Sequence, residues 1–255
     1  MNISIRITRQ LLRVSILISA LLVSANSVAA SLGVLPIRLY LDSEKPISSL
    51  TVKNRGDTVA LVQSQVMLWT QVNGESVLEP SDDVIVSPPI FEIDPGKDQT
   101  VRIGYVAEQP SGSEKTYRLM LSEVPGSQAP KGTGVQVNLR LSLPIFIASD
   151  DFKPIVKWSA EQACDGKLRL SADNVGTKHT MITGIKIAAT SQADPVHSIA
   201  RPRYLLAGAA TWWDIDSEGL NLPNRFAVVA SVLNGTSIEQ TVSSSRQVCT
   251  QATSE

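Results

Sequence analysis

The stretch VQVNLRLSLPIFI, residues 135–147, indicates the fold class of this chain. Apolar residues occupy every second position from Val135 to Ile147, and polar residues fill most of the positions between them. This alternation predicts a β-strand with one apolar face. The stretch is also much longer than a typical strand of about 5–6 residues. We therefore ask whether the apolar row fills the core of its own domain or that of another protein.

The segments around this stretch predict an all-β protein. Short apolar and β-branched runs such as ALVQSQVMLWTQV and KLRLSADN alternate with turn-forming runs such as NRGD, NGE and DPGKD. No run shows a sustained helical period of 3.6 residues with caps. The same texture continues beyond ASDDFKP, residues 148–154. We predict two immunoglobulin-like β-sandwich domains, residues 31–149 and 150–255.

The first thirty residues have the pattern of a secretory signal peptide. They carry Arg6, Arg9 and Arg13 without any acidic residue, then the apolar run VSILISALLV, then small residues ending at Ala30. The apolar run is too short to span a bilayer, which takes about 20 residues of helix. Cleavage after Ala30 would leave 20 basic and 24 acidic residues, a net charge of −4. We expect an exported mature chain that does not insert into a membrane.

The thiol and charge content excludes several classes of function. Cys164 and Cys249 are the only two cysteines, and in an exported chain such a pair most often forms one disulfide. A metal pair is less favoured, because no other Cys or His lies near either residue at ligand spacing. The chain has no basic tract and only scattered aromatic residues, so nucleic-acid binding is not indicated.

No pattern in the sequence supports an enzyme, a cofactor or a metal site. The two histidines, His179 and His197, stand apart, and the usual nucleophile, phosphate-binding and zinc motifs are missing. The acidic pairs Asp82-Asp83 and Asp150-Asp151 are adjacent, so on extended chain their side chains diverge. Asn234-Gly235-Thr236 matches a glycosylation sequon, but Asn-Gly is first of all a hairpin turn signal.

The sequence blocks of the first domain resemble the periplasmic pilus chaperones of the chaperone–usher pathway. The resemblance rests on LGVLPIRLYLDSEKPISSLTVKN, VIVSPPIFEIDPGKDQTVRIGY, YRLMLSEVP and VQVNLRLSLPIFI, in that order. The ending Leu-Pro-Ile-Phe is similar to the archaic, spore-coat-protein-U type branch. The resemblance implies a boomerang of two immunoglobulin-like domains in the periplasm. It also implies binding of incomplete pilus subunits and their delivery to an outer-membrane usher.

The resemblance implies that the long strand is donated to a subunit that lacks its own last strand. Such a strand would add backbone hydrogen bonds and apolar side chains to the exposed groove of the subunit. The residues expected to fill that groove are Val135, Val137, Leu139 and Leu141. Ile145 and Ile147 are expected to anchor the strand in its own domain. A free apolar strand also predicts a self-capping dimer of the unbound chaperone.

The family also implies a basic anchor for the C-terminal carboxylate of the subunit. Arg38 matches one of two anchor positions, and arginine suits a carboxylate because its planar fork donates two parallel bonds. The second position holds Pro144 in place of a lysine, so we consider Arg102, Arg118 and Arg140 as weaker candidates. Glu114 matches a position that ties the two domains by an ion pair, but the usual basic partner is replaced by Ala148.

Two other functions remain open at this stage. One is a structural pilus subunit or adhesin with tandem immunoglobulin-like domains, for which the opening stretch SLGVLPIRLYL offers a partial donor extension. The other is a carbohydrate- or metal-binding module that uses Trp212-Trp213 as a stacking platform. Neighbouring residues of a strand face opposite sides, so we expect one of these two tryptophans in the core.

Overall fold

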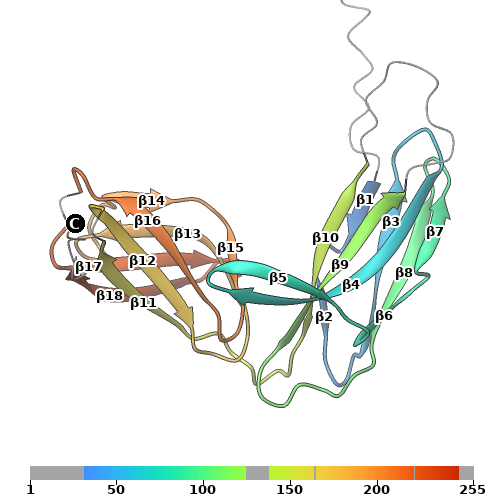
Figure 1. Ribbon diagram of the computed structural model, residues 1–255, viewed down its shortest axis with the longest axis horizontal. Helices are drawn as coiled ribbons and strands as arrows, with labels where there is room; N and C mark the ends of the chain where they lie inside the picture. Colours follow the sequence, from blue (N-terminus) through green and yellow to red (C-terminus); the bar gives the residue numbers. More distant parts are fainter. Residues whose placement is uncertain (1–31, 125–137, 164, 221, 247–255) are drawn as a thin grey trace, which may run out of the picture.

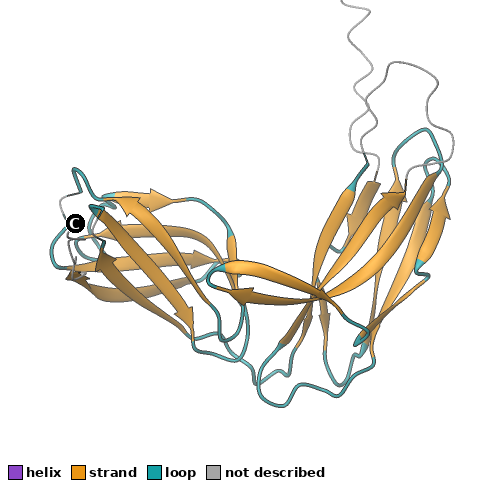
Figure 2. Ribbon diagram, in the orientation of Figure 1, coloured by secondary structure: helices purple, strands orange, loops and turns teal. Residues whose placement is uncertain are grey.

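The computed structural model describes residues 32–124, 138–163, 165–220 and 222–246. Throughout these ranges the regular structure consists of strands, as Figure 2 shows. The all-β fold class with two domains is therefore confirmed. Within the described ranges, no helix of sufficient length and apolar character to cross a membrane occurs.

The first domain consists of two facing sheets. One sheet has the order β1-β3-β8-β6, and the other has the order β2-β10-β9-β4-β5, with β7 paired to β4. The strands are β1 (Leu32–Leu35), β2 (Leu39–Leu41), β3 (Ile47–Asn54), β4 (Ala60–Val72), β5 (Glu75–Pro80), β6 (Val84–Ser87), β7 (Ile90–Ile93), β8 (Asp98–Tyr105), β9 (Lys115–Val124) and β10 (Arg140–Ile147). Their inner faces share one core that includes Leu50, Val101, Leu119 and Ile145.

The second domain is a single path of strands that encloses its own core. The order is β14-β13-β17-β18-β11-β12-β16, with β15 paired to β13. The strands are β11 (Val156–Gln162), β12 (Lys167–Asn174), β13 (Thr180–Ala188), β14 (His197–Ile199), β15 (Arg203–Leu205), β16 (Ala210–Asp216), β17 (Arg225–Val232) and β18 (Ser237–Arg246). Leu170 of β12 and Ile185 of β13 belong to the same buried cluster, so the two ends of this path face each other across the core.

The same asparagine hub supports both domains. Asn54 donates from its side chain to the carbonyls of Thr58 and Ile93, and its Oδ1 accepts from the backbone N–H of Gly56. Asn174 repeats the arrangement with the carbonyls of Lys178, Leu205 and Leu206 and with the N–H of Gly176. Both asparagines are buried, and their bonds satisfy backbone groups at a turn that leaves the sheet. This repeated Asn-x-Gly turn was not predicted from the sequence.

A long hairpin links the first domain to the second. Strands β4 and β5 turn at Asn73-Gly74, both with positive φ, as the sequence signal of an Asn-Gly hairpin predicts. A Cβ atom added at Gly74 would lie 3.4 Å from side-chain atoms of Thr211 and Trp212, so the tip of the hairpin reaches β16. Figure 1 shows this hairpin reaching from the first domain to the second.

Candidate functional site

The buried residues of β10 divide between two cores, one on each face of the strand. Leu143, Ile145 and Ile147 are buried in the core of the first domain, as predicted for Ile145 and Ile147. Phe146 points to the opposite face, is fully buried and belongs to the core cluster of the second domain together with Trp69. Leu139 and Leu141 lie against the first core but are only partly buried. The end of β10 therefore helps to hold the two domains together.

One edge of β10 is open over residues 140–144. On its other edge, β10 pairs antiparallel with β9, and the carbonyl of Leu139 accepts from the N–H of Glu123. Because bonded and non-bonded pairs alternate in an antiparallel ladder, the backbone groups of Arg140 and Ser142 point away from β9. Strand β2 covers that edge only at residues 145–147. No other described strand pairs with it, and we call residues 140–144 the open edge.

Pro144 lies at the inner end of the open edge, where its missing N–H breaks no bond to β9. It stands opposite Arg118 in the register, at a position whose backbone points away from β9. This is the kind of edge position at which proline is tolerated in a sheet. The side chains of such a non-bonded pair lie close together. The position that lacks the family's lysine therefore has an arginine as its direct cross-strand neighbour.

Arg38 is held at the same end of the edge by the second domain. It immediately precedes β2, the strand that takes over the edge at Ile145. Its Nε donates to the hydroxyl of Tyr204 on β15 at 2.8 Å, and one terminal nitrogen lies 3.8 Å from the sulfur of Met181. Arg38 is half-buried. The predicted anchor residue thus lies at the junction between the domains.

Arg118 lies at the same junction. Its Cζ lies 3.6 Å from the ring centroid of Trp69 and 5.6 Å from that of Tyr204. Burial lowers the pKa of the Arg118 guanidinium, which nonetheless stays protonated at neutral pH. Both Arg38 and Arg118 therefore contact Tyr204, and we refer to these two residues as the arginine pair.

The arginine pair has no anionic partner in the described part of the chain. The ion pairs there join Lys53 to Asp98, Lys167 to Asp165, Arg169 to Asp214 and His179 to Glu114. Two half-buried cations without a counter-ion form a favourable environment for an anion. A carboxylate would suit the planar donors of both guanidinium groups.

The other two candidate arginines lie elsewhere. Arg102 is exposed on β8 in the opposite sheet, between Ser49 and Ser87. Arg140 is exposed at the outer end of β10. Sequence reasoning placed Arg118 on a par with these two, because its contacts with Trp69 and Tyr204 come from distant parts of the chain. Arg118 differs from these two because the β9–β10 register places it directly opposite Pro144.

Glu114 does tie the two domains together, through a partner that the sequence did not indicate. Its Oε2 lies 2.7 Å from His179 Nδ1 and accepts from the backbone N–H of His179 at 2.8 Å. The side chain of Glu114 is 0% exposed and that of His179 is 9% exposed. The imidazole also stacks on Phe146, with 3.5 Å between ring centroids. His179 thus occupies the role that the resemblance gave to the residue at Ala148.

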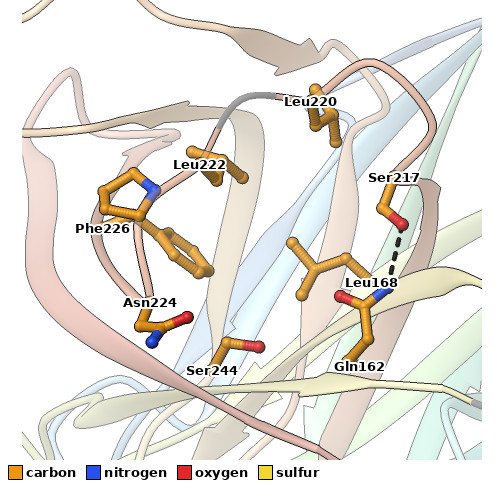
Figure 3. Close-up of a pocket in the computed structure, with 9 residues that line it drawn as sticks. Gln162, Leu168, Ser217, Leu220, Leu222, Asn224, Phe226 and Ser244 are labelled. Atoms are coloured by element: carbon orange, nitrogen blue, oxygen red, sulfur yellow. Dashed lines mark hydrogen bonds between the residues drawn. The ribbon is translucent and has the colours of Figure 1, made fainter.

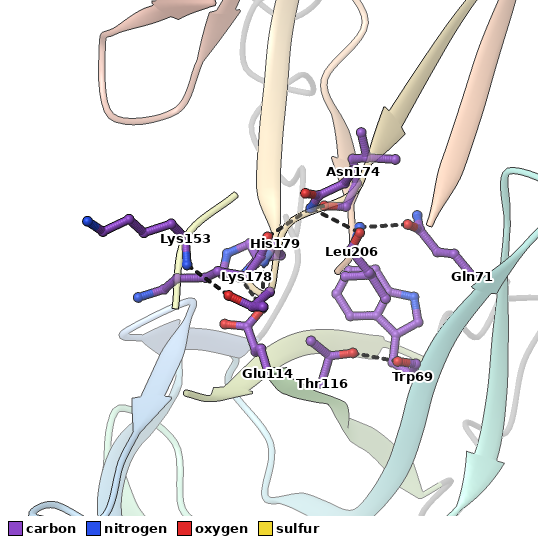
Figure 4. Close-up of polar contacts among 11 residues, drawn as sticks. Trp69, Gln71, Glu114, Thr116, Lys153, Asn174, Lys178, His179 and Leu206 are labelled. Atoms are coloured by element: carbon purple, nitrogen blue, oxygen red, sulfur yellow. Dashed lines mark hydrogen bonds and ion pairs between the residues drawn. The ribbon is translucent and has the colours of Figure 1, made fainter. Parts of the chain in front are cut away.

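Gln71 adds a second set of polar contacts between the domains. Its Nε2 donates to the carbonyl of Tyr204 at 2.9 Å, and its Oε1 accepts from the N–H of Leu206 at 2.8 Å. Figure 4 shows this contact beside the Glu114–His179 pair. Together these bonds fix the strand that carries Tyr204 against the first domain.

Features that favoured other functions do not form a chemical site. Trp213 is buried and stacks on Trp158, as expected for one residue of the Trp-Trp pair. A cavity of about 280 Å³ in the second domain (Figure 3) has a lining of apolar and neutral polar side chains, among them Gln162, Leu168 and Phe226. The described residues contain no cluster of three metal-ligating side chains. His197 lies on β14, a strand that was not predicted.

Some predicted residues fall outside the described ranges. These are Val135 and Val137 of the long strand and the predicted disulfide residues Cys164 and Cys249. The segment predicted as a signal peptide also lies there. These predictions therefore stay predictions.

Comparisons with known proteins find fimbrial chaperones among the proteins that this chain resembles. Residues 31–152 match the family described as pili and flagellar-assembly chaperone, PapD N-terminal domain. The chain is 32% identical over 149 residues to the chaperone protein FimB/FhaD of Bordetella pertussis, an alignment that covers 54% of this chain and 59% of that protein. It is 27% identical over 147 residues to the probable fimbrial chaperone LpfB of Escherichia coli O157:H7, covering 56% and 60%. The chain thus spans about three fifths of each relative.

Solved structures share the fold over almost their whole length. The archaic CsuC–CsuE chaperone–tip adhesion subunit complex of Acinetobacter baumannii gives a TM-score of 0.64 at 20% identity, with 86% of this chain and 100% of that chain covered. The complex of Salmonella enterica SafA pilin with the SafB chaperone gives 0.60 at 14% identity, with 86% and 98% covered. Residues 31–152 are thus similar to the N-terminal domain of pilus and flagellar-assembly chaperones, and the solved structures share the two-domain fold.

Proposed function

We propose that this protein is a periplasmic chaperone of the chaperone–usher pathway. It binds incomplete pilus subunits by donor-strand complementation and delivers them to an outer-membrane usher, without enzymatic activity or a cofactor. The observation that carries this proposal is the open edge of β10, which ends at two cations that have no counter-ion among the described residues. The Leu-Pro-Ile-Phe sequence and the likeness to the CsuC–CsuE complex favour the archaic branch.

The open edge has the properties that strand addition requires. Arg140 and Ser142 present backbone donors and acceptors away from β9, and Leu139 and Leu141 offer apolar side chains that their own core covers only in part. A fully buried leucine contributes about 1.5–3 kcal/mol. The stabilisation gained on binding is smaller than this, because Leu139 and Leu141 are already partly buried against the core of the first domain. Val135 and Val137 would extend the same row.

The charges at the inner end of the edge set the direction of the bound strand. Strand β2 runs parallel to β10 on this same edge, and Arg38 immediately precedes it. A partner strand that also runs parallel to β10 would point its C-terminus at Arg38. An antiparallel partner would bring its N-terminal ammonium against the arginine pair, and like charges repel. The site therefore favours a strand that ends in a free carboxylate, as a subunit without its last strand would provide.

The remaining expectations concern a dimer, an alternative function and the domain limits. An unpaired edge in the free protein favours a self-capped dimer, with a second copy covering residues 140–144. The structural pilus subunit or adhesin is not favoured, because the named relatives are fimbrial chaperones. We retain residues 31–149 and 150–255 as the proposed domain limits.

Co-production with a pilus subunit in the periplasm tests this function. We expect the double variant Leu139→Asp, Leu141→Asp to lose recovery of the subunit, because two carboxylates would have to enter an apolar groove. The control is Ile85→Asp, which places one carboxylate at a residue that is exposed on the other sheet. Unchanged subunit recovery with the folded double variant would refute donor-strand binding.

A further inference from the structure

Tyr204 contacts both members of the arginine pair. It lies on β15 of the second domain and pairs with Met181 of β13. Its ring meets that of Trp69 edge-on at 5.3 Å between centroids, and its carbonyl accepts from Gln71. The aromatic contact and the backbone bond fix the side chain at the junction between the domains, so its hydroxyl has a defined position.

The hydroxyl of Tyr204 has a proton to offer. Its oxygen accepts a hydrogen bond from Arg38 Nε, which uses one lone pair of the oxygen. A phenolic hydroxyl is also a donor, and no acceptor for that proton is found among the described residues. Since Arg38 Nε is used by Tyr204, the terminal nitrogens of Arg38 remain for another ligand, apart from the weak contact of one of them with the Met181 sulfur.

We propose that Tyr204 is a positioning and binding residue of the carboxylate site, supplied by the second domain. It orients Arg38 through Nε and donates its own O–H to the terminal carboxylate of the strand bound on the open edge. The inference rests on the proposed function. It assigns the second domain a direct part in recognition, in addition to its role as a support for the first.

The proposed role of Tyr204 also gives a reason for the polar contacts that hold the two domains together. The Gln71 bonds and the Glu114–His179 pair fix the second domain within hydrogen-bond distance of Arg38. A donor that must meet a carboxylate at about 2.7 Å tolerates little movement of the domain that carries it. The carboxylate would then have donors from three strands or their ends: Arg38 before β2, Arg118 on β9 and Tyr204 on β15.

The test uses the full mature chain and a labelled peptide of about nine residues with alternating valine and threonine, a usual strand length. The peptide is prepared with a free C-terminal carboxylate and, separately, as the carboxamide. We expect the wild-type protein to prefer the carboxylate. Tyr204→Phe should weaken binding of the carboxylate form about ten- to a hundredfold, the effect of one hydrogen bond to a charged group, and should leave carboxamide binding nearly unchanged.

Two comparisons separate the possible outcomes. Tyr40→Phe removes a hydroxyl at the same junction that makes no hydrogen bond to the described residues, and it should leave the carboxylate preference intact. An equal loss in Tyr40→Phe, or an unchanged preference in Tyr204→Phe, would overturn the role of Tyr204 alone. If the wild-type protein bound neither peptide, or bound both equally, the proposed open-edge and carboxylate site would itself be wrong. Thermal unfolding of both variants shows that they are folded.

Discussion

The last strands of the two domains, β10 and β18, are built alike but are closed differently. Each pairs antiparallel with the preceding strand and, over its final three residues, parallel with an early strand of its own domain. In the second domain, the Gln240 side chain on β18 bonds to both the N–H and the C=O of Trp158 on β11, at 3.0 Å each. Along residues 140–144 of β10, no described residue provides such a bridge.

This difference shows how the same fold can either bridge its last strand to a neighbour or leave the edge of that strand open to a partner. A buried asparagine hub of the same design holds each sandwich together. In the second domain, the Gln240 side chain of β18 bridges to the Trp158 backbone of β11 beyond the residues at which these two strands pair. In the first domain, the backbone groups of Arg140 and Ser142 stay available to a partner. We infer that β10 can bind a partner strand because no side chain of the described residues bridges its edge as Gln240 bridges β18 to β11.

The largest expected effect concerns the arginine pair at the end of the open edge. Arg38→Ala and Arg118→Ala should each weaken binding of a carboxylate-terminated strand by about ten- to a hundredfold, because each removes a charge-assisted hydrogen bond. Peptide affinity measured by fluorescence anisotropy checks this, with Arg102→Ala as the matched control on the opposite sheet. Equal affinities for all three variants would place the anchor elsewhere.

An intermediate effect is expected from removing the Gln240 bridge between β18 and β11. Gln240→Ala removes the bridge between β18 and β11 and leaves two part-buried backbone groups of Trp158 without partners. We expect the free energy of unfolding to fall by about 1–3 kcal/mol, the cost of unsatisfied polar groups. Urea denaturation measures this loss, and carboxylate-peptide binding should persist at urea concentrations where the variant is folded. A change below about 0.3 kcal/mol would show that the bridge is dispensable.

The smallest effect is expected from an exposed cross-strand ion pair. The Arg169 guanidinium holds the pKa of Asp214 below its usual range. A carboxyl with a lowered pKa in the folded state stabilises the fold above its unfolded pKa. That contribution is lost as the pH falls through the lowered value. Because the pair is exposed, Asp214→Asn should cost about 0.5 kcal/mol or less at neutral pH.

Comparing unfolding of Asp214→Asn with wild type at pH 7 and near pH 2.5 checks the sign. The difference should shrink as the pH falls through the lowered pKa of Asp214, because the wild-type carboxyl then also becomes neutral. A difference that grows toward low pH would contradict the assigned role of the pair.

The sequence predicted the strands well because their signal is local. ALVQSQVMLWTQV and KLRLSADN coincide with β4 and β12, and Asn73-Gly74 forms the expected hairpin turn. The alternation in residues 135–147 correctly placed Ile145 and Ile147 in the core of the first domain. It could not show that Phe146, on the opposite face, belongs to the core of the second domain. Periodicity tells which residues share a face, and it does not tell what covers that face.

The site was harder to predict because its contacts are distant in sequence. Arg38 was expected from the family resemblance. Arg118 gains its place only from the β9–β10 register and from the rings of Trp69 and Tyr204. His179 was given no chemical role from the sequence, but it directly precedes β13 and is the partner of Glu114 across the domain junction. Such pairs form only once both domains are folded and docked.

The open edge of β10 can be tested most directly with one substitution, Ser142→Pro. The N–H of Ser142 points away from β9, so proline there removes a donor from the partner and none from the home ladder. Pro144 shows that this strand accommodates proline at such a position. Pro144→Ala is the matched control, because it adds an N–H to the same edge.

We predict that Ser142→Pro lowers co-purification of a pilus subunit at least about tenfold, since it removes a backbone hydrogen bond and introduces a clash with the added strand. Its melting temperature should stay close to that of the wild type, and Pro144→Ala should retain the subunit. Full subunit recovery by a folded Ser142→Pro variant would contradict the account, because the edge of β10 would then not be where the partner binds.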